Sequence, residues 1–403
     1  MTQVPAASAT LRALKYALEN APDSQIVRIV GMVQELEERP DGEDILAVVR
    51  ARLRPLRPER KLRLSRLLFV PLQPVLADAA QWRPNAVTVP RSAIRPLCAV
   101  VAAAAPDIMA PAEAMIATAT TRDLAVIEAA GAIVWPAAAR ILLAAQTPPA
   151  DWTAAGLPAA SFEPLARTVG HCLGAAAILP QLSDPTMDAA QIDRLTSMML
   201  RQAVQKGPSC WGTTAALLIC SVPQAQAPRD AVLHQGAATP LRNAAEAALA
   251  HVWLWIAAAA DGAPIELAEA AASLRRRAIV LGALAADRHC RAEAARLQAE
   301  LRAIYIHHLV NAAQERLTAP IIALTTPPDD AAMAGFEHEA RGLRRLALEL
   351  RALGTQTAVD RALRDAAAAI GAAPALPAID RARLVEILED TEAAMRLLAA
   401  KTH

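Results

Sequence analysis

The chain has few aromatic residues and few glycines. Phe, Trp and Tyr together make up 3% of its 403 residues, and there are 15 glycines. β-Sheets are enriched in aromatic and β-branched side chains, whereas alanine, leucine and arginine are strong helix formers. Because alanine and leucine dominate the apolar residues, the sequence predicts an all-α protein with little or no sheet.

Cysteine is scarce as well. The five cysteines are odd in number, widely spaced and set in apolar stretches, and no CxxC motif occurs. Disulfide frameworks and zinc sites use closely spaced sets of cysteines, which are missing here. We therefore interpret the cysteines as reduced core residues and expect a cytoplasmic protein that needs no metal or other cofactor. They are Cys98, Cys172, Cys210, Cys220 and Cys290.

The sequence also lacks long hydrophobic runs. Its first 20 residues show no basic region, apolar run and cleavage site of the kind that marks a signal peptide. The longest apolar runs are Ala129–Ala139 and Ala247–Ala260. Both are shorter than the roughly 20 residues that a spanning helix needs. We expect buried helices at these places and no transmembrane segment.

No charge of one sign prevails. The net charge is +1 and the pI is about 7.7, although only four of the 41 basic residues are lysines. A balanced chain has no global field that would draw it to nucleic acid or to a membrane surface. Any binding that depends on charge must therefore come from local clusters of charged residues.

The length suggests several domains or one extended array, since 403 residues exceed a simple bundle. We expect a multi-helix array in the N-terminal and middle parts, followed by a long-helix bundle. The three parts are a short-helix segment with acidic and basic faces (1–78), an alanine-rich helical domain (91–222) and the bundle (241–403). Prolines make 71–90 an irregular connection, in which 86–89 can be extended, and 222–240 a loop. Within the first two parts we expect helices from a cap at Asp23 or Ser24 to about Glu38, and at about 43–54, 59–70, 91–104, 111–119, 121–145 (kinked or divided at Pro136), 162–178, 188–206 and 211–221.

The C-terminal part has the clearest periodicity. Three apolar seams advance by three and four residues, which suits near-antiparallel helix packing. The same seams can pair between chains, so the sequence is also compatible with a homo-oligomer. Asp329, which follows two prolines, marks a helix start. The seams are Leu267, Ala271, Leu274, Ala278 and Leu281; Leu343, Leu346, Leu350 and Leu353; and Leu384, Leu388, Thr391, Met395 and Leu398.

The strongest local signal is a pair of opposite charge clusters. Residues 35–44 carry six acids against one arginine, and residues 50–66 carry eight bases against one glutamate. Arginine-rich faces bind phosphates or acidic protein partners. The alternative is that the acidic cluster neutralises the basic one within the fold. The candidate anion- or partner-binding residues are Arg50, Arg54, Arg57, Arg60, Arg63 and Arg66.

A second candidate is the segment His251–Trp255, which holds two of the six tryptophans. His251 and Trp255 are four residues apart and share one face of a helix. They can line a pocket, or they can belong to the core, where the indole N–H needs a hydrogen-bond partner. Because Trp253 lies on another face, the segment predicts a centrally placed helix.

Motifs of known chemistry are otherwise missing. The segment Ser209-Cys210-Trp211 resembles the nucleophile segment of papain-type proteases, but the second cysteine of that family and a β-rich second half with its His–Asn pair are not in the sequence. His307-His308 and Glu337-His338-Glu339 do not have metal-ligand spacing. Phosphate-binding glycine motifs and serine-nucleophile motifs are also missing.

The sequence alone therefore favours a non-enzymatic helical adaptor or regulatory protein that acts through protein–protein contacts. The alternative is an all-α enzyme or small-ligand binder with a pocket between helices, for which His251, Trp255, His338 and Cys210 are the first residues to test. A weaker alternative is nucleic-acid binding through the Arg50–Arg66 face.

Overall fold

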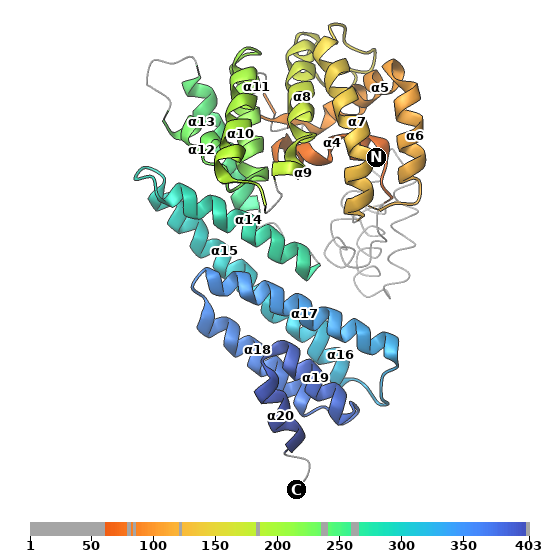
Figure 1. The fold of residues 1–403 in the computed structure, drawn as a ribbon, viewed down its shortest axis with the longest axis vertical. Coiled ribbons are helices and arrows are strands. Elements are labelled where there is room, and N and C mark those ends of the chain that lie inside the picture. Colours follow the sequence, from red (N-terminus) through yellow and green to blue (C-terminus); the bar gives the residue numbers. More distant parts are fainter. Residues whose placement is uncertain are drawn as a thin grey trace, which may run out of the picture. The chain divides into compact units, whose positions relative to one another are not determined.

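Figure 1 shows the computed structural model of the chain. It describes residues 61–78, 82–83, 86–120, 123–182, 186–234, 241–258 and 266–399. Of these residues, 77% are helical, and the sheet they form is a two-stranded pair. The prediction of an all-α fold is confirmed. The helices predicted before residue 61 lie outside the described residues.

The chain forms two compact units. One comprises Met1–Leu62 and Ala117–Leu124, and the other comprises Arg63–Ile116 and Ala125–His403. In the described part of the first, Lys61 pairs with Thr120 in an antiparallel bridge. The amide of Leu62 also donates to the carbonyl of Ala119 at 2.8 Å. The three-part division at 1–78, 91–222 and 241–403 stays a prediction.

Short and medium helices make up the chain from residue 64 to residue 233 (Figure 1). Their bounds are α4 (Leu64–Phe69), the 3-10 helix η1 (Val70–Val75), strands β1 (Leu76–Ala77) and β2 (Val89–Pro90), η2 (Arg91–Ala93), α5 (Ile94–Ala104), α6 (Pro106–Ile116), α7 (Leu124–Ala144), η3 (Ala159–Ser161), α8 (Phe162–Ala176), α9 (Leu179–Leu182), α10 (Ala189–Val204), α11 (Pro208–Ser221) and α12 (Ala227–Leu233).

Prolines explain two of the differences from the predicted helices, and a third difference occurs at a proline. Helix α6 begins at Pro106, five residues before the prediction, because a proline at a first helical position loses no hydrogen bond. For the same reason, Pro228 lies in the first turn of α12, inside the predicted loop 222–240. Helix α7 continues through Pro136, where we predicted a kink or a break. The buried residues on both sides of this proline, Trp135 and Ala137, hold the adjacent turns in place.

The two strands pair next to the stretch 86–89, for which the sequence allows an extended conformation. Leu76 pairs with Val89 and Ala77 with Pro90, in parallel register. The extended part is therefore at the end of the predicted 86–89 stretch. The helix predicted from residue 59 instead begins at Leu64 and gives way to η1 at Val70.

Helix α11 is the buried centre of the larger unit. Its residues 211–220 are all buried, and it contacts α8, α10, α12, α13 and η1. Gly212 permits this close packing, since a Cβ there would lie 2.5 Å from Cγ1 of Val87 and 3.0 Å from the carbonyl oxygen of Ala244. The sequence placed the His251–Trp255 helix at the centre. In the structure that helix carries Leu254 at 67% exposure, so the expectation was wrong.

The remaining helices lie between residues 242 and 399. Their bounds are α13 (Arg242–Ala257), α14 (Leu267–Ala285), α15 (Arg291–Ala312), the π-helix η5 (Ala313–Thr318), α16 (Ala319–Ile322), α17 (Asp330–Ala352), α18 (Gln356–Gly371), α19 (Ala378–Leu388) and α20 (Thr391–Ala399).

Two of the three predicted seams are largely buried as expected. On α17 and just after it, Leu343, Leu346, Leu350 and Leu353 are buried, and α17 contacts α14, α15 and α19. On α14, four of the five predicted positions are buried, and Ala278 is half-buried. The start predicted at Asp329 is also confirmed, because its carboxylate accepts a hydrogen bond from the amide of Ala332 at 2.8 Å.

The third seam was wrong. The helix ends at Leu388, and a new helix starts at Thr391. Asp390 caps this second helix by accepting a hydrogen bond from the amide of Ala393 at 2.8 Å. Met395 is consequently turned outward and is 61% exposed.

One helix in the described part is long and apolar enough to cross a membrane. It is α7, with 21 residues, and half of its most apolar window is buried inside the protein. A bent pair, Arg91–Ala104 with Pro106–Ile116, passes the same test only when both helices are taken together across a 117° bend. Core helices of soluble proteins share these properties, so the absence of a spanning segment stays a prediction.

Candidate functional site

The structure describes two of the six arginines in the predicted basic face. Arg63 precedes α4 and is exposed, and Arg66 lies within α4 and is half-buried. Arg50, Arg54, Arg57 and Arg60 lie outside the described residues. The basic face therefore stays a prediction.

His251 is tied to a neighbouring segment. It lies on α13, where its ring is half-buried, and its Nε2–H donates to the carbonyl oxygen of Pro74 in η1 at 2.7 Å. Burial of the ring disfavours the charged imidazolium and lowers the pKa of His251 below its ordinary value, and the hydrogen bond to the carbonyl opposes this only in part. The neutral ring thus links α13 to η1.

Trp255 is covered by an arginine. The guanidinium of Arg277, on α14, lies 4.7 Å from the centroid of the Trp255 ring. Its Nε donates to the carbonyl oxygen of Trp255 at 3.3 Å, and its Nη1 bonds the hydroxyl of Ser273. The hydroxyl of Tyr305 also donates to that of Ser273, at 3.3 Å. This set caps the C-terminal end of α13 and joins it to α14, which is a structural role.

Cys210 belongs to the core. It is buried at the start of α11, and burial raises the pKa of its thiol to about 11. The hydroxyls of Thr168 and Thr214 are its hydrogen-bonding partners. The ring of His171 donates instead to the carbonyl oxygen of Met199 at 3.1 Å. The thiol of Cys210 is thus protonated at neutral pH and is a poor nucleophile.

The acidic motif around His338 is structural too. Glu337 is buried, and its carboxylate lies 2.6 Å from Nη2 of Arg341 and 2.7 Å from Nε of Arg383. It therefore joins α17 to α19. His338 is exposed, 3.9 Å from Glu266. Among the described residues, no three His, Cys, Asp or Glu side chains are grouped in a way that could hold a metal ion.

A groove runs between α15 with η5 on one side and α18 on the other. We call it the α15–α18 groove, and its volume is about 720 Å³. Small and apolar side chains supply much of its surface, and neutral polar groups supply most of the rest. Its lining residues are Ile306, Val310, Asn311, Ala313, Gln314, Thr318, Thr357, Ala358, Arg361, Ala362, Asp365, Ala366 and Ala369.

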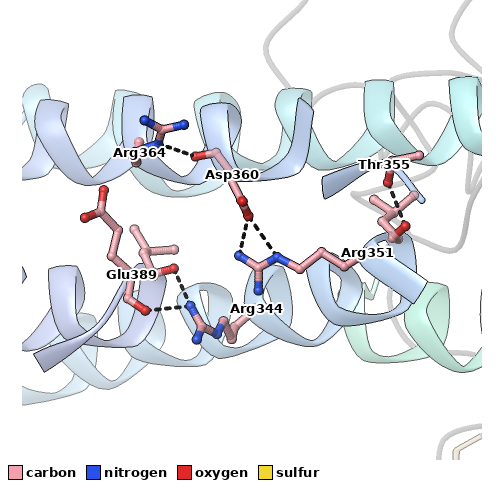
Figure 2. A network of polar contacts seen from close by, with 8 residues as sticks. Arg344, Arg351, Thr355, Asp360, Arg364 and Glu389 are labelled. Carbon is pink, nitrogen blue, oxygen red and sulfur yellow. Dashed lines mark hydrogen bonds and ion pairs between the residues drawn. The ribbon is translucent and has the colours of Figure 1, made fainter. Parts of the chain in front are cut away.

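A polar network joins α18 to α17 (Figure 2). Arg351 of α17 holds Asp360 of α18 through Nε at 2.9 Å and Nη2 at 2.7 Å. Arg344 of α17 donates to the carbonyl oxygens of Leu388 and Glu389 at 2.8 and 2.7 Å and so caps the end of α19. Because Asp360 is two residues from Ala358, it points about 200° away around the helix. The groove face of α18 therefore takes no part in this network.

The π-helix shapes the other wall of the groove. Residues Ala313–Thr318 follow α15 directly and continue into α16. A π-turn inserts one extra residue into a helix, and such turns are frequent at functional sites. Ala313, Gln314 and Thr318 of this turn all line the groove.

Sequence reasoning missed this groove. A signal was present in the alanines at 358, 362, 366 and 369 of α18, which recur at three and four residues. They adjoin the core face formed by Val359, Leu363 and Ile370. Alanines beside a core face also occur where helices simply pack, so the spacing does not reveal an open groove.

A smaller concavity lies beside the segment that follows β1. We call it the Trp82 pocket, and its volume is about 170 Å³. Residues 82, 86 and 88, the stretch 158–161 with the first turns of α8, and the start of α11 contribute to its wall. Its lining residues are Trp82, Ala86, Thr88, Pro158, Ala160, Ser161, Pro164, Leu165, Thr168 and Ser209.

Comparison of the chain with protein-family models, with curated proteins and with solved structures finds no match. Any function must therefore be inferred from the structure itself, and the α15–α18 groove and the Trp82 pocket are the concavities from which we infer it.

Proposed function

We propose that this protein is a non-enzymatic cytoplasmic adaptor that binds an amphipathic helix of another protein in the α15–α18 groove. The observation that carries the proposal is the groove itself, an open volume of about 720 Å³ bordered by two helices. Grooves of this kind bind helices through apolar side chains at positions i, i+3, i+4 and i+7.

The dimensions of the groove suit a helical ligand. Its α18 wall runs from Thr357 to Ala369. At 1.5 Å per residue this is about 18 Å, or roughly three helical turns. Alanines at 358, 362, 366 and 369 let a second helix approach closely, and Val310, which is 44% exposed, offers apolar surface on the opposite wall.

The charges at the groove suggest an orientation for the ligand. Arg361 and Asp365 lie one turn apart on α18, and their side chains are 83% and 75% exposed. Their own contact, at 3.9 Å, is long and solvated and so contributes little to stability. Both charges remain accessible to a helix that carries an acid and a base one turn apart in the opposite order.

The chemistry of the groove suits binding better than catalysis. Its polar side chains include Asn311, Gln314, Thr318 and Thr357, which do not titrate near neutral pH. The buried thiols of Cys172, Cys210 and Cys220 all have raised pKa values because burial disfavours the thiolate. Apart from the solvent-exposed Asp365, these thiols and the groove lining supply neither a general base nor an activated nucleophile.

The test is affinity capture of the tagged full chain from its native cell, with and without nuclease, followed by mass spectrometry. Wild type is compared with Val310→Arg and Ala358→Arg, which place a charge on opposite walls of the groove. Leu348→Arg is the matched control, since Leu348 is 53% exposed on α17 and does not line the groove. Circular dichroism confirms that each variant is folded.

We expect a stoichiometric protein that survives nuclease, binds wild type and Leu348→Arg, and is lost with Val310→Arg and Ala358→Arg. A synthetic helix from that protein should bind the full chain with at least tenfold lower affinity when Ala358 is arginine. Equal capture by all four proteins would refute the groove. Partners that vanish with nuclease would favour the arginine face, and capture of further copies of this chain would favour self-association.

A further inference from the structure

The Trp82 pocket is formed by other helices and segments than the α15–α18 groove, and it suits another class of ligand. Its volume of about 170 Å³ is close to that of a protein cavity of about 150 Å³ that binds benzene. It is much smaller than the space a helix needs. A ligand here must therefore be a small molecule with about one ring.

The walls of the pocket are held in place before any ligand arrives. The indole N–H of Trp82 donates to the carbonyl oxygen of Thr88 at 3.1 Å. The carbonyl oxygen of Pro158 accepts from the indole of Trp152 at 3.0 Å and from the hydroxyl of Ser161 at 2.6 Å. These bonds fix both sides of the pocket, so little ordering opposes binding.

The lining determines which ligand chemistry fits. It contains Trp, Pro, Ala, Leu, Thr and Ser residues and no ionisable side chain. A charged ligand would lose its hydration without gaining an ion pair, which is costly. A neutral aromatic ring instead gains apolar contact with Trp82, Pro164 and Leu165.

The hydroxyls favour a ligand that donates one hydrogen bond. Ser161 uses its hydrogen on the carbonyl oxygen of Pro158, so the lone pairs of its hydroxyl oxygen can accept. Thr88, Thr168 and Ser209 also line the pocket. An aromatic O–H or N–H is the complementary group.

We propose that the Trp82 pocket binds a neutral, single-ring aromatic molecule that carries one hydrogen-bond donor. This small-molecule ligand is separate from the helix that we propose for the α15–α18 groove. Occupancy of the pocket would join Trp82, Ala86 and Thr88 to α8 and α11, because all of them line it.

The test uses ¹⁹F NMR on the full chain with 4-fluorophenol as the probe, and 4-fluorobenzoate and fluorobenzene for comparison. Ala160→Leu fills the pocket, and Ala159→Leu is the matched control, since Ala159 is exposed in the same 3-10 turn but does not line it. Ala86→Leu is a second filling variant at another residue of the lining. Thermal melting confirms that each variant is folded.

We expect saturable one-to-one binding of 4-fluorophenol that weakens at least tenfold with Ala160→Leu or Ala86→Leu and is unchanged with Ala159→Leu. Binding of 4-fluorobenzoate should be at least tenfold weaker than that of 4-fluorophenol, and fluorobenzene should fall between the two. No saturable binding of 4-fluorophenol, or equal binding by the filled and control variants, would overturn the proposal. Equal affinity for 4-fluorobenzoate would overturn the ligand class.

Discussion

Replacement of Gly212 by alanine tests the close packing around α11. In an ordinary helix interior this change is favourable by about 1 kcal/mol, because alanine is the better helix former. At Gly212 the new Cβ would lie 2.5 Å from Cγ1 of Val87 and 3.0 Å from the carbonyl oxygen of Ala244. Carbon atoms in van der Waals contact are about 3.5–4.0 Å apart, so the neighbouring segments must separate by roughly 1 Å.

The sign of the effect depends on which contribution is larger. Inserting a methylene into a packed core costs about 1–3 kcal/mol. Val87 is β-branched and stiff, and the oxygen of Ala244 belongs to the backbone of α13, so neither moves easily. We therefore expect Gly212→Ala to destabilise the protein by about 1 kcal/mol in spite of its helix propensity.

Gly282→Ala is the matched control. Gly282 is exposed within α14, and a Cβ there would meet nothing within 4 Å. This variant should be more stable than wild type by about 1 kcal/mol, the full difference in helix propensity between alanine and glycine. The two variants should thus melt on opposite sides of wild type, each displaced by about 1–2 °C in thermal circular dichroism.

A melting temperature for Gly212→Ala at or above that of Gly282→Ala would refute the close approach of α11 to Val87 and Ala244. A second readout is available in the Trp82 pocket, since Val87 lies between two of its lining residues. Displacement of Val87 should weaken binding of 4-fluorophenol by Gly212→Ala and leave it unchanged in Gly282→Ala.

Three further predictions concern the polar contacts of the core. The folded-state pKa of His251 lies below its ordinary value of 6.5, so the contribution of His251 to stability is present above pH 6.5 and is lost as the pH falls through the lowered pKa. His251→Gln should therefore reduce the difference in urea midpoint between pH 7 and pH 5. Arg277→Lys removes the planar group stacked on Trp255, so thermal melting should show a loss of about 1 kcal/mol, whereas an unchanged melt would contradict the stacking. Glu337→Ala should cost about 1–2 kcal/mol in urea denaturation, because its two arginine partners are more than half exposed and regain water; a loss above roughly 4 kcal/mol would mean that they are effectively buried.

The sequence predicts helices best where apolar spacing and a cap agree. Asp329 supplies the cap of α17, and Leu343 and Leu350 supply its apolar spacing. The structure has that helix. The seam predicted through Leu388 and Met395 had the right spacing, but Asp390 interrupts it as a cap. Local chemistry of the cap therefore overrode the periodicity.

The contacts between distant segments could not be predicted. His251 bonds Pro74, which is 177 residues away in the chain, and Trp255 is covered by Arg277 of another helix. Both pairs depend on how helices are placed in space, which residue spacing within one helix does not encode. The same holds for the α15–α18 groove, whose walls come from separate helices.

The alanine-rich core changes how the protein should respond to mutation. Several alanines are completely buried, and helices approach one another closely where they lie; examples are Ala130, Ala138, Ala166, Ala203, Ala215 and Ala216. An alanine loses no side-chain entropy on burial, but it also leaves little to remove. Relative to a leucine-rich core, this core should therefore be damaged less by substitutions that shorten a side chain and more by substitutions that enlarge one. Enlarging a buried position should be the commonest damaging change, and the sequence should drift most easily among small residues.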